Sequence, residues 1–207
     1  MKFTPSYCTD EDDYYRMRDF LREVFLLNDR LEHSWHVARL DYWRWHFIEN
    51  CRLCESVEKS PAIWETDGGK IIAVANALSH DEVRLHVHPE YRTPALEEEM
   101  LAYAEQHFFD LTQSGRPYIY LPVFRDDTQR QEIVLRRGYQ KVEGFGNHWR
   151  RDLDAPVPET PLAPGYTIRS MGLIDEHPAR SWASWRAFHS DEGDENYDGD
   201  WSWYQHL

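Results

Sequence analysis

A short alternating stretch near the middle of the sequence carries the side chains best suited to proton transfer. Residues 82–88 alternate between polar and apolar types, which predicts a strand with one buried face and one solvated face. Glu82 and His86 lie on the polar face, and either side chain could accept a proton from an attacking amine. The ordinary pKa of an imidazole makes His86 the better suited of the two near neutral pH. A polar residue on such a strand more commonly belongs only to the solvated face, so both interpretations stand.

The residues after this strand form a well-capped helix start. Arg92 precedes the pair Thr93-Pro94, and consecutive glutamates follow at residues 97–99. Threonine is a favoured N-cap, proline fits the first helical turn, and glutamates near the N-terminus interact favourably with the helix dipole. Backbone N–H groups at a helix start can also bind an anion. The sequence therefore predicts a helix that begins at Thr93, and this start needs no ligand to be stable.

Other helices and strands must hold these residues in place. Helical spacing of apolar residues and the terminating Gly138 predict helices, and alternation on both sides of Asp67-Gly68-Gly69 predicts a hairpin. In chain order we expect strand 2–7, helix 10–27, helix 36–48, strands 62–66, 70–79 and 82–88, helix 93–108 and strand 118–124. A helix capped by Asp126 or Asp127 and ending at about Arg137 follows, and then a closing strand pair within 139–152.

The C-terminal part of the sequence differs in composition. Prolines spaced through residues 154–165 exclude a helix or a central strand and predict a semi-rigid linker. Beyond it, residues 166–171 are strand-like and 174–189 helical, and Trp201 with Trp203 repeats the spacing of Trp43 and Trp45. We therefore expect a first domain at 1–153, a linker at 154–165 and the beginning of a second, incomplete copy at 166–207.

Composition and charge restrict the class of protein. Hydrophobic residues make up 41% and aromatic residues 14% of the 207-residue chain, which is too much apolar surface for a disordered protein. The formal charge of −14 disfavours nucleic acid and anionic lipid as partners and weakly favours cationic substrates such as amines. We find no apolar run long enough to span a bilayer and no signal-peptide pattern, and the odd number of cysteines disfavours a disulfide framework. These features predict a cytoplasmic protein with no membrane partner.

Two local motifs and the order of elements resemble a known family. The run VHPEYR at residues 87–92 leaves a strand and enters the longest helix, and the run VLRRGY at residues 134–139 ends the last helix before the final strand pair. Together they are similar to the GCN5-related N-acetyltransferases over residues 1–153. The linker and restart resemble the tandem, mycothiol-synthase type. The resemblance implies an α+β protein with a three-layer α/β/α acyl-CoA N-acyltransferase fold around a central mixed, mostly antiparallel sheet.

The resemblance also implies a reaction and a binding loop. The reaction is transfer of an acetyl group from acetyl-CoA to an amine, so the expected partners are an acyl-CoA and a small amine or peptide acceptor. The family loop reads Arg/Gln-x-x-Gly-x-Gly/Ala and binds the coenzyme A pyrophosphate through backbone N–H groups. Carried over to this chain, the acyl-CoA-binding residues are Leu85, Val87, Arg92, Thr93, Ala95, Leu96 and Glu97.

The loop departs from the family pattern at three positions. Pro94 has no N–H to donate, Ala95 adds a side chain where glycine allows close approach, and Glu97 brings a surface carboxylate towards the phosphates. The family's tyrosine, which protonates the leaving thiolate, corresponds to Val134. Two functions therefore remain open: an acetyltransferase with weakened acyl-CoA binding, and a non-catalytic structural or regulatory domain with the same fold.

Other groupings in the sequence are weaker. Cys51 and Cys54 have metal-ligand spacing without a second pair, and His86 with His88 lacks a third ligand, so no metal site is predicted. The tryptophans of the first copy could line a pocket for a cation, although such rings are more often core. Those of the incomplete second copy need a covering surface, which leads us to expect a homodimer.

Overall fold

The computed structural model describes residues 5–31, 33–50, 61–78, 82–111, 114–142 and 151–199. The chain divides into two compact units, with the boundary between Tyr139 and Gln140. The boundary lies before the proline-rich segment. Each unit is described by itself.

The first unit is built on an antiparallel sheet of four strands in the order β1-β2-β3-β4. The strands are β1 (Ser6–Tyr7), β2 (Ala62–Glu65), β3 (Ile71–Ala77) and β4 (Val83–Val87). The turn between β2 and β3 contains Gly69 at φ 76°, a left-handed conformation that favours glycine. This turn confirms the hairpin predicted around Asp67-Gly68-Gly69. In the strand order β4 lies at the end of the sheet.

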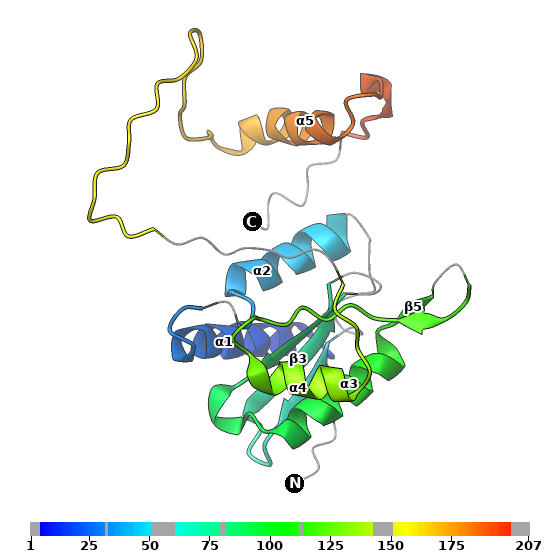
Figure 1. The fold of residues 1–207 in the computed structure, drawn as a ribbon. Coiled ribbons are helices and arrows are strands. Elements are labelled where there is room, and N and C mark those ends of the chain that lie inside the picture. The colour runs from blue at the N-terminus through cyan, green and yellow to red at the C-terminus, as the bar shows by residue number, and fades with distance from the viewer. Residues whose placement is uncertain are drawn as a thin grey trace. The chain divides into compact units, whose positions relative to one another are not determined.

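Helices cover both faces of this sheet (Figure 1). On one face lie α1 (Glu11–Leu27), α2 (Val37–Tyr42) and a π-helical turn at Trp43–Asn50. On the other face lie α3 (Pro94–His107) and α4 (Thr128–Arg136). The first face buries side chains such as Met17, Phe20, Trp35, Trp43 and Val74, and the second buries Leu85, Leu96, Met100, Ala104 and Ile133. The mixed α+β class predicted from the sequence is confirmed.

The helix ends follow the predicted capping residues. Thr93 is the N-cap of α3 and its hydroxyl accepts a hydrogen bond from the Leu96 N–H. Of the two aspartates expected to cap α4, Asp127 rather than Asp126 is the N-cap, and Gly138, at φ 86°, ends that helix. The helix predicted at 36–48 is present but changes from α2 to the π-helical turn at Trp43.

Two predictions about strands of the first unit are wrong. The polar face of β4 is not solvated, because α1 and the connection to α2 cover it: His86 is 2% and His88 1% exposed. The strand predicted at 118–124 is largely irregular. It is represented by β6 (Pro117–Tyr118), which pairs with β5 (Asp110–Leu111), and by one isolated parallel bridge between Glu82 and Tyr120.

The second unit contains one α-helix in its described part, α5 (His177–Phe188), with a 3-10 turn at Ile174–Glu176 before it and another at Asp194–Asn196. The strand predicted at 166–171 is absent: Ile168 is 82% exposed and no described segment of this unit pairs with it. A single short strand without a partner is not stable. The tryptophan repeat at 201–203, the central part of the predicted closing strand pair and the Cys51/Cys54 pair lie outside the described residues. None of the helices within the described ranges combines the length and apolarity that a bilayer span requires.

Candidate functional site

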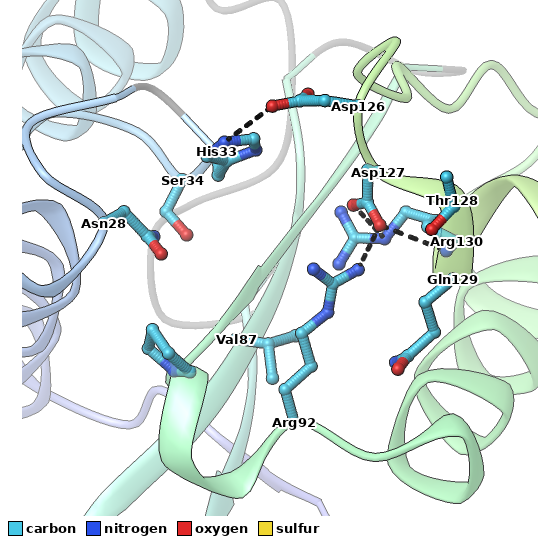
Figure 2. Close-up of a pocket in the computed structure, with 11 residues that line it drawn as sticks. Asn28, His33, Ser34, Val87, Arg92, Asp126, Asp127, Thr128, Gln129 and Arg130 are labelled. Carbon is cyan, nitrogen blue, oxygen red and sulfur yellow. Dashed lines mark hydrogen bonds and ion pairs between the residues drawn. The ribbon is translucent and has the colours of Figure 1, made fainter.

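A polar cleft of about 340 Å³ lies at the C-terminal end of β4 (Figure 2). Three segments that are distant in sequence form its walls. They are the end of β4 with the following turn, the start of α4, and the connection between α1 and α2. The residues that line it are Val87, Pro89 and Arg92, the segment 126–130, and Asn28, His33 and Ser34.

On one edge of β4 no described strand pairs beyond Val83, and Val87 on this edge lines the cleft. The register with β3 pairs Ala73 with Val87 and Ala75 with Leu85, and the hydrogen bond from His88 N–H to Ile72 O fixes which residues bond to β3. Because bonded and non-bonded pairs alternate in an antiparallel ladder, the backbone groups of Leu85 and Val87 point away from β3. Val83 N–H on the same edge donates to Tyr120 O at 2.9 Å, and beyond that bridge no described strand pairs with β4. Leu85 and Val87 on this edge are 3% and 6% exposed, and Val87 lines the cleft, so a ligand would reach the edge from its Val87 end.

Arg130 contacts this edge of β4. Its Nη1 donates to the carbonyl oxygen of Leu85 at 3.3 Å, although Arg130 belongs to α4 and is only 5% exposed. No described strand pairs with the N–H of Leu85 or with the two backbone groups of Val87.

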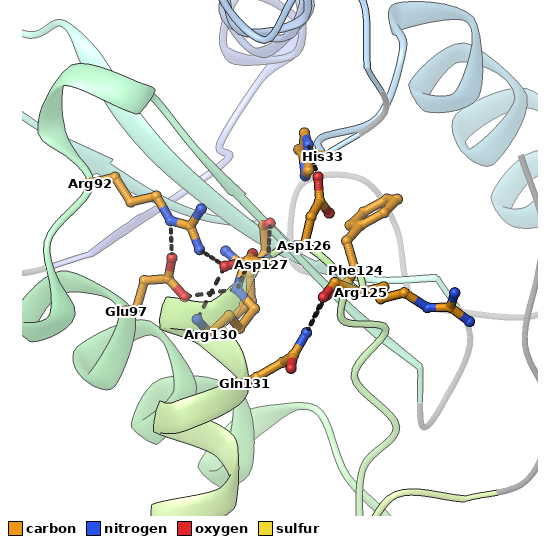
Figure 3. A network of polar contacts seen from close by, with 10 residues as sticks. His33, Arg92, Glu97, Phe124, Arg125, Asp126, Asp127, Arg130 and Gln131 are labelled. Atoms are coloured by element: carbon orange, nitrogen blue, oxygen red, sulfur yellow. Dashed lines mark hydrogen bonds and ion pairs between the residues drawn. The ribbon is translucent and has the colours of Figure 1, made fainter.

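The arginine that the resemblance assigns to the phosphates belongs to a buried ionic network (Figure 3). Arg92 Nη2 lies 2.6 Å from Asp127 Oδ1, and Arg92 Nε donates to Glu97 Oε1. Arg130 Nε donates to the other Glu97 oxygen at 2.7 Å. Two arginines and two carboxylates thus balance in charge. Burial alone would raise the pKa of Asp127, but the hydrogen bonds from Arg92 and from the Arg130 backbone outweigh it and lower that pKa.

The burial of Glu97 therefore differs from the sequence prediction. It was expected as a surface carboxylate, yet its side chain is 0% exposed and holds both arginines. The start of α3 is also internally satisfied: Thr93 Oγ1 accepts from Leu96 N–H at 3.2 Å, and Thr93 O accepts from Glu97 N–H at 3.1 Å. The resemblance implies that the N–H groups of Ala95, Leu96 and Glu97 bind phosphate. Those of Leu96 and Glu97 are already engaged, which leaves the N–H of Ala95.

The two predicted catalytic bases lie in different places. Glu82 forms an ion pair with Arg84 at the start of β4, the end of the strand remote from the cleft. His86 is enclosed: its Nδ1 accepts from Trp35 N–H at 3.3 Å, and its Nε2 lies 3.1 Å from Asn76 Oδ1. Desolvation, helped by the charges of Arg84 and Arg130, lowers the pKa of His86 to about 3. With both ring nitrogens occupied, His86 has no lone pair for a substrate proton.

The structure adds residues that sequence reasoning missed. His33 and Ser34 line the cleft from the connection between α1 and α2, and Ser34 is 4% exposed. His33 Nε2 lies 3.6 Å from Asp126 Oδ2 across the cleft. Neither periodicity nor a motif marks His33, so only the fold shows that it lines the same cleft as Arg92.

The remaining sequence candidates are structural. Val134 is 9% exposed and packs in the core beneath α3, so no proton donor stands at that position. His88 Nε2 lies 3.1 Å from Glu23 Oε1, and its Nδ1 accepts from Glu90 N–H. Within the described residues no three His, Cys, Asp or Glu side chains are grouped so that they could hold a metal ion.

Comparisons with known proteins leave the family open. No protein-family model matches the chain, and the search of curated proteins finds no relative.

Proposed function

We propose that the first unit is an acyl-CoA-dependent N-acyltransferase that transfers an acetyl group from acetyl-CoA to an amine. The observation that carries this proposal is the edge of β4 at Leu85 and Val87, with which no described strand pairs; Val87, at the end of that edge, lines the cleft that also contains Arg92. An extended molecule with amide groups can bind such an edge as an added strand would. The pantetheine arm of an acyl-CoA is an extended chain of this kind. The three-layer arrangement and the parallel bridge at Glu82 support the resemblance to the acetyltransferase fold.

Binding of the diphosphate would require the ionic network to rearrange. Arg92 is 27% exposed in its side chain, whereas Glu97 and Asp127 are deeply buried, so Arg92 is the member that a ligand can reach. A phosphate would compete with these two carboxylates for the guanidinium. We therefore expect binding that is weak and depends on salt concentration.

The acceptor in this proposal is a small amine or a peptide amine. Asp126 stands on the wall of the cleft with its side chain 68% exposed and can attract an ammonium group. The formal charge of −14 acts in the same direction over a longer range.

A second candidate is a non-catalytic domain with the same fold. It is favoured by a specific observation: Arg92 is fully paired and Leu96 N–H is capped by Thr93, so the loop is stable without a ligand. For such a domain, the carboxylates of Glu97 and Asp127 would pair with Arg92 in place of a phosphate.

Calorimetric titration of the purified chain with acetyl-CoA separates the two candidates. Micromolar binding that is lost in Arg92→Ala, and kept in Arg136→Ala, supports the acyltransferase. Arg136 is a matched control because it pairs with Glu98 on the surface and does not line the cleft. Absence of binding in a wild-type chain with a cooperative thermal transition supports the non-catalytic domain.

A further inference from the structure

The segment 119–124 meets β4 at one point and then leaves it. Glu82 and Tyr120 form an isolated parallel bridge, and Val83 N–H donates to Tyr120 O at 2.9 Å. Alternate residues of the segment nevertheless pack, as in a strand, against the core that β4 shares with α3: Ile119, Leu121 and Val123. The side chains therefore follow a strand pattern, whereas the backbone of residues 121–124 belongs to no described strand.

Pro122 is the residue at which this pairing ends. In a parallel ladder, every second residue of a strand both donates to and accepts from its neighbour. Tyr120 is such a residue, because its carbonyl oxygen accepts the Val83 N–H. The next is Pro122, whose N–H would have to donate to the carbonyl oxygen of Val83, but proline has no N–H. The hydrogen bond that would follow the Glu82–Tyr120 bridge therefore lacks its donor.

Farther along, the start of α4 holds the segment away from β4. If the pairing continued, Val87 N–H would donate to the carbonyl oxygen of Phe124. That oxygen accepts instead from Asp127 N–H at 3.2 Å and from Gln131 Nε2 at 2.8 Å, the second of which Figure 3 shows. Val87 and Asp127 consequently line the cleft and are not joined through a ladder.

Arg130 alone does not account for the separation. Its guanidinium binds the carbonyl oxygen of Leu85 at 3.3 Å, so it opposes the pairing of residue 124 rather than that of residue 122. In the same register, Leu85 N–H would donate to the carbonyl oxygen of Pro122, a group that proline retains. Between these two described residues that bond is not formed. The two backbones therefore separate at Pro122, before the position of Arg130 is reached.

We propose that Pro122 is a positioning residue that keeps the N–H of Leu85 and the backbone of Val87 available to the acyl-CoA. This inference rests on the proposed acyltransferase function and names the residue that makes room for its co-substrate. A paired strand would lie about 4.8 Å from β4 and would use the same amide groups as an extended ligand. Without an N–H at residue 122, the segment keeps its packing on the core and does not take up this edge.

The test restores the missing donor. Pro122→Ala and Pro122→Val both return an N–H to residue 122, and valine also favours a strand. NMR scalar couplings across hydrogen bonds should then join the amide nitrogen of residue 122 to the Val83 carbonyl carbon, and the Leu85 amide nitrogen to the carbonyl carbon of residue 122; wild type should lack the second coupling. Calorimetry should show acetyl-CoA affinity weakened by roughly 10-fold or more, because the edge is occupied. Pro117→Ala is the matched control, since Pro117 is exposed and pairs with β5.

Each outcome decides the matter. Folded variants that show neither coupling overturn the role of Pro122, and the acyltransferase proposal stands as long as wild type binds acetyl-CoA. Couplings that appear without a loss of affinity also overturn it, because the ligand would then not need this edge. A wild-type chain that does not bind acetyl-CoA overturns the proposed function together with this inference, so the two failures are told apart by the wild-type titration.

Discussion

The imidazole of His86 joins two segments that are 51 residues apart: its Nδ1 accepts the backbone N–H of Trp35 at 3.3 Å. Its other nitrogen lies 3.1 Å from Asn76 Oδ1, so the ring is assigned as neutral with the proton on Nε2. The His86 side chain on β4 therefore contacts both β3, through Asn76, and the connection that carries His33 and Ser34. The shape of the cleft depends on this ring staying uncharged.

The stability of the first unit should fall on mild acidification because of His86. The folded pKa is about 3 and the ordinary value is 6.5, so the unfolded chain binds the proton first. The stabilisation is complete above pH 6.5 and is lost as the pH falls towards 3, by about 1.4 kcal/mol per pH unit. Urea unfolding between pH 7 and pH 4.5 measures it. His86→Gln should show a shallower pH dependence than wild type, and equal slopes would contradict the assignment.

Glu97→Gln should be strongly destabilising. The substitution removes the buried charge that pairs Arg92 with Arg130 and leaves a guanidinium uncompensated in the core, which costs about 3–5 kcal/mol. Glu98→Gln is a matched control on the same helix, because Glu98 forms partly exposed pairs with Arg136 and Arg137 worth about 1 kcal/mol or less. The difference between the two urea midpoints is the measurement. Similar midpoints would mean that the network contributes little.

Asp127→Asn should tighten binding of CoA if the proposed site is correct. Asparagine keeps the N-cap of α4 but removes one of the two charges that compete with a phosphate for Arg92. A change of about 1 kcal/mol, or roughly 5-fold in Kd, is expected at low salt. Asp110→Asn, an exposed aspartate on β5, controls for net charge. Equal affinity of the two variants would argue against a phosphate at Arg92.

Cys8 should resist alkylation in the folded chain. Its thiol is fully buried, and desolvation together with the charge of Asp13 raises the pKa of Cys8 to about 11. A rise of about two units leaves roughly a hundredfold less thiolate at any pH near 8. In a chain carrying Cys51→Ser and Cys54→Ser, iodoacetamide should react slowly until urea unfolds the protein. Rapid reaction without urea would show that the first strand and α1 open readily.

Local features of the fold could be predicted because short-range chemistry determines them. The hairpin at Gly69, the caps at Thr93 and Asp127 and the stop at Gly138 each depend on residues within one turn. The helical spacing of apolar residues likewise predicts α1 and α3, whose apolar residues Met17, Phe20, Leu96 and Met100 are buried.

The cleft could not be predicted because it depends on which helices cover the sheet and on contacts between residues that are distant in sequence. Alternation along β4 indicates a polar face, but only packing of α1 and Trp35 shows that His86 on that face is buried. Glu97 looks like one of three surface glutamates until Arg130, 33 residues away, is placed beside it. The segment 166–171 has strand-like residues but no described partner, so its pattern does not become a strand.

The guanidinium of Arg130 beside Leu85 has a consequence for solubility. An unpaired strand edge is a template on which another copy of the chain can add a strand, and such growth leads to aggregation. At Leu85 a newcomer's backbone would have to displace a charged donor from the carbonyl oxygen, and Glu97 holds that guanidinium in place. Arg130 thus opposes the addition of a strand from another copy at this edge, while a narrow ligand could still bind beside it.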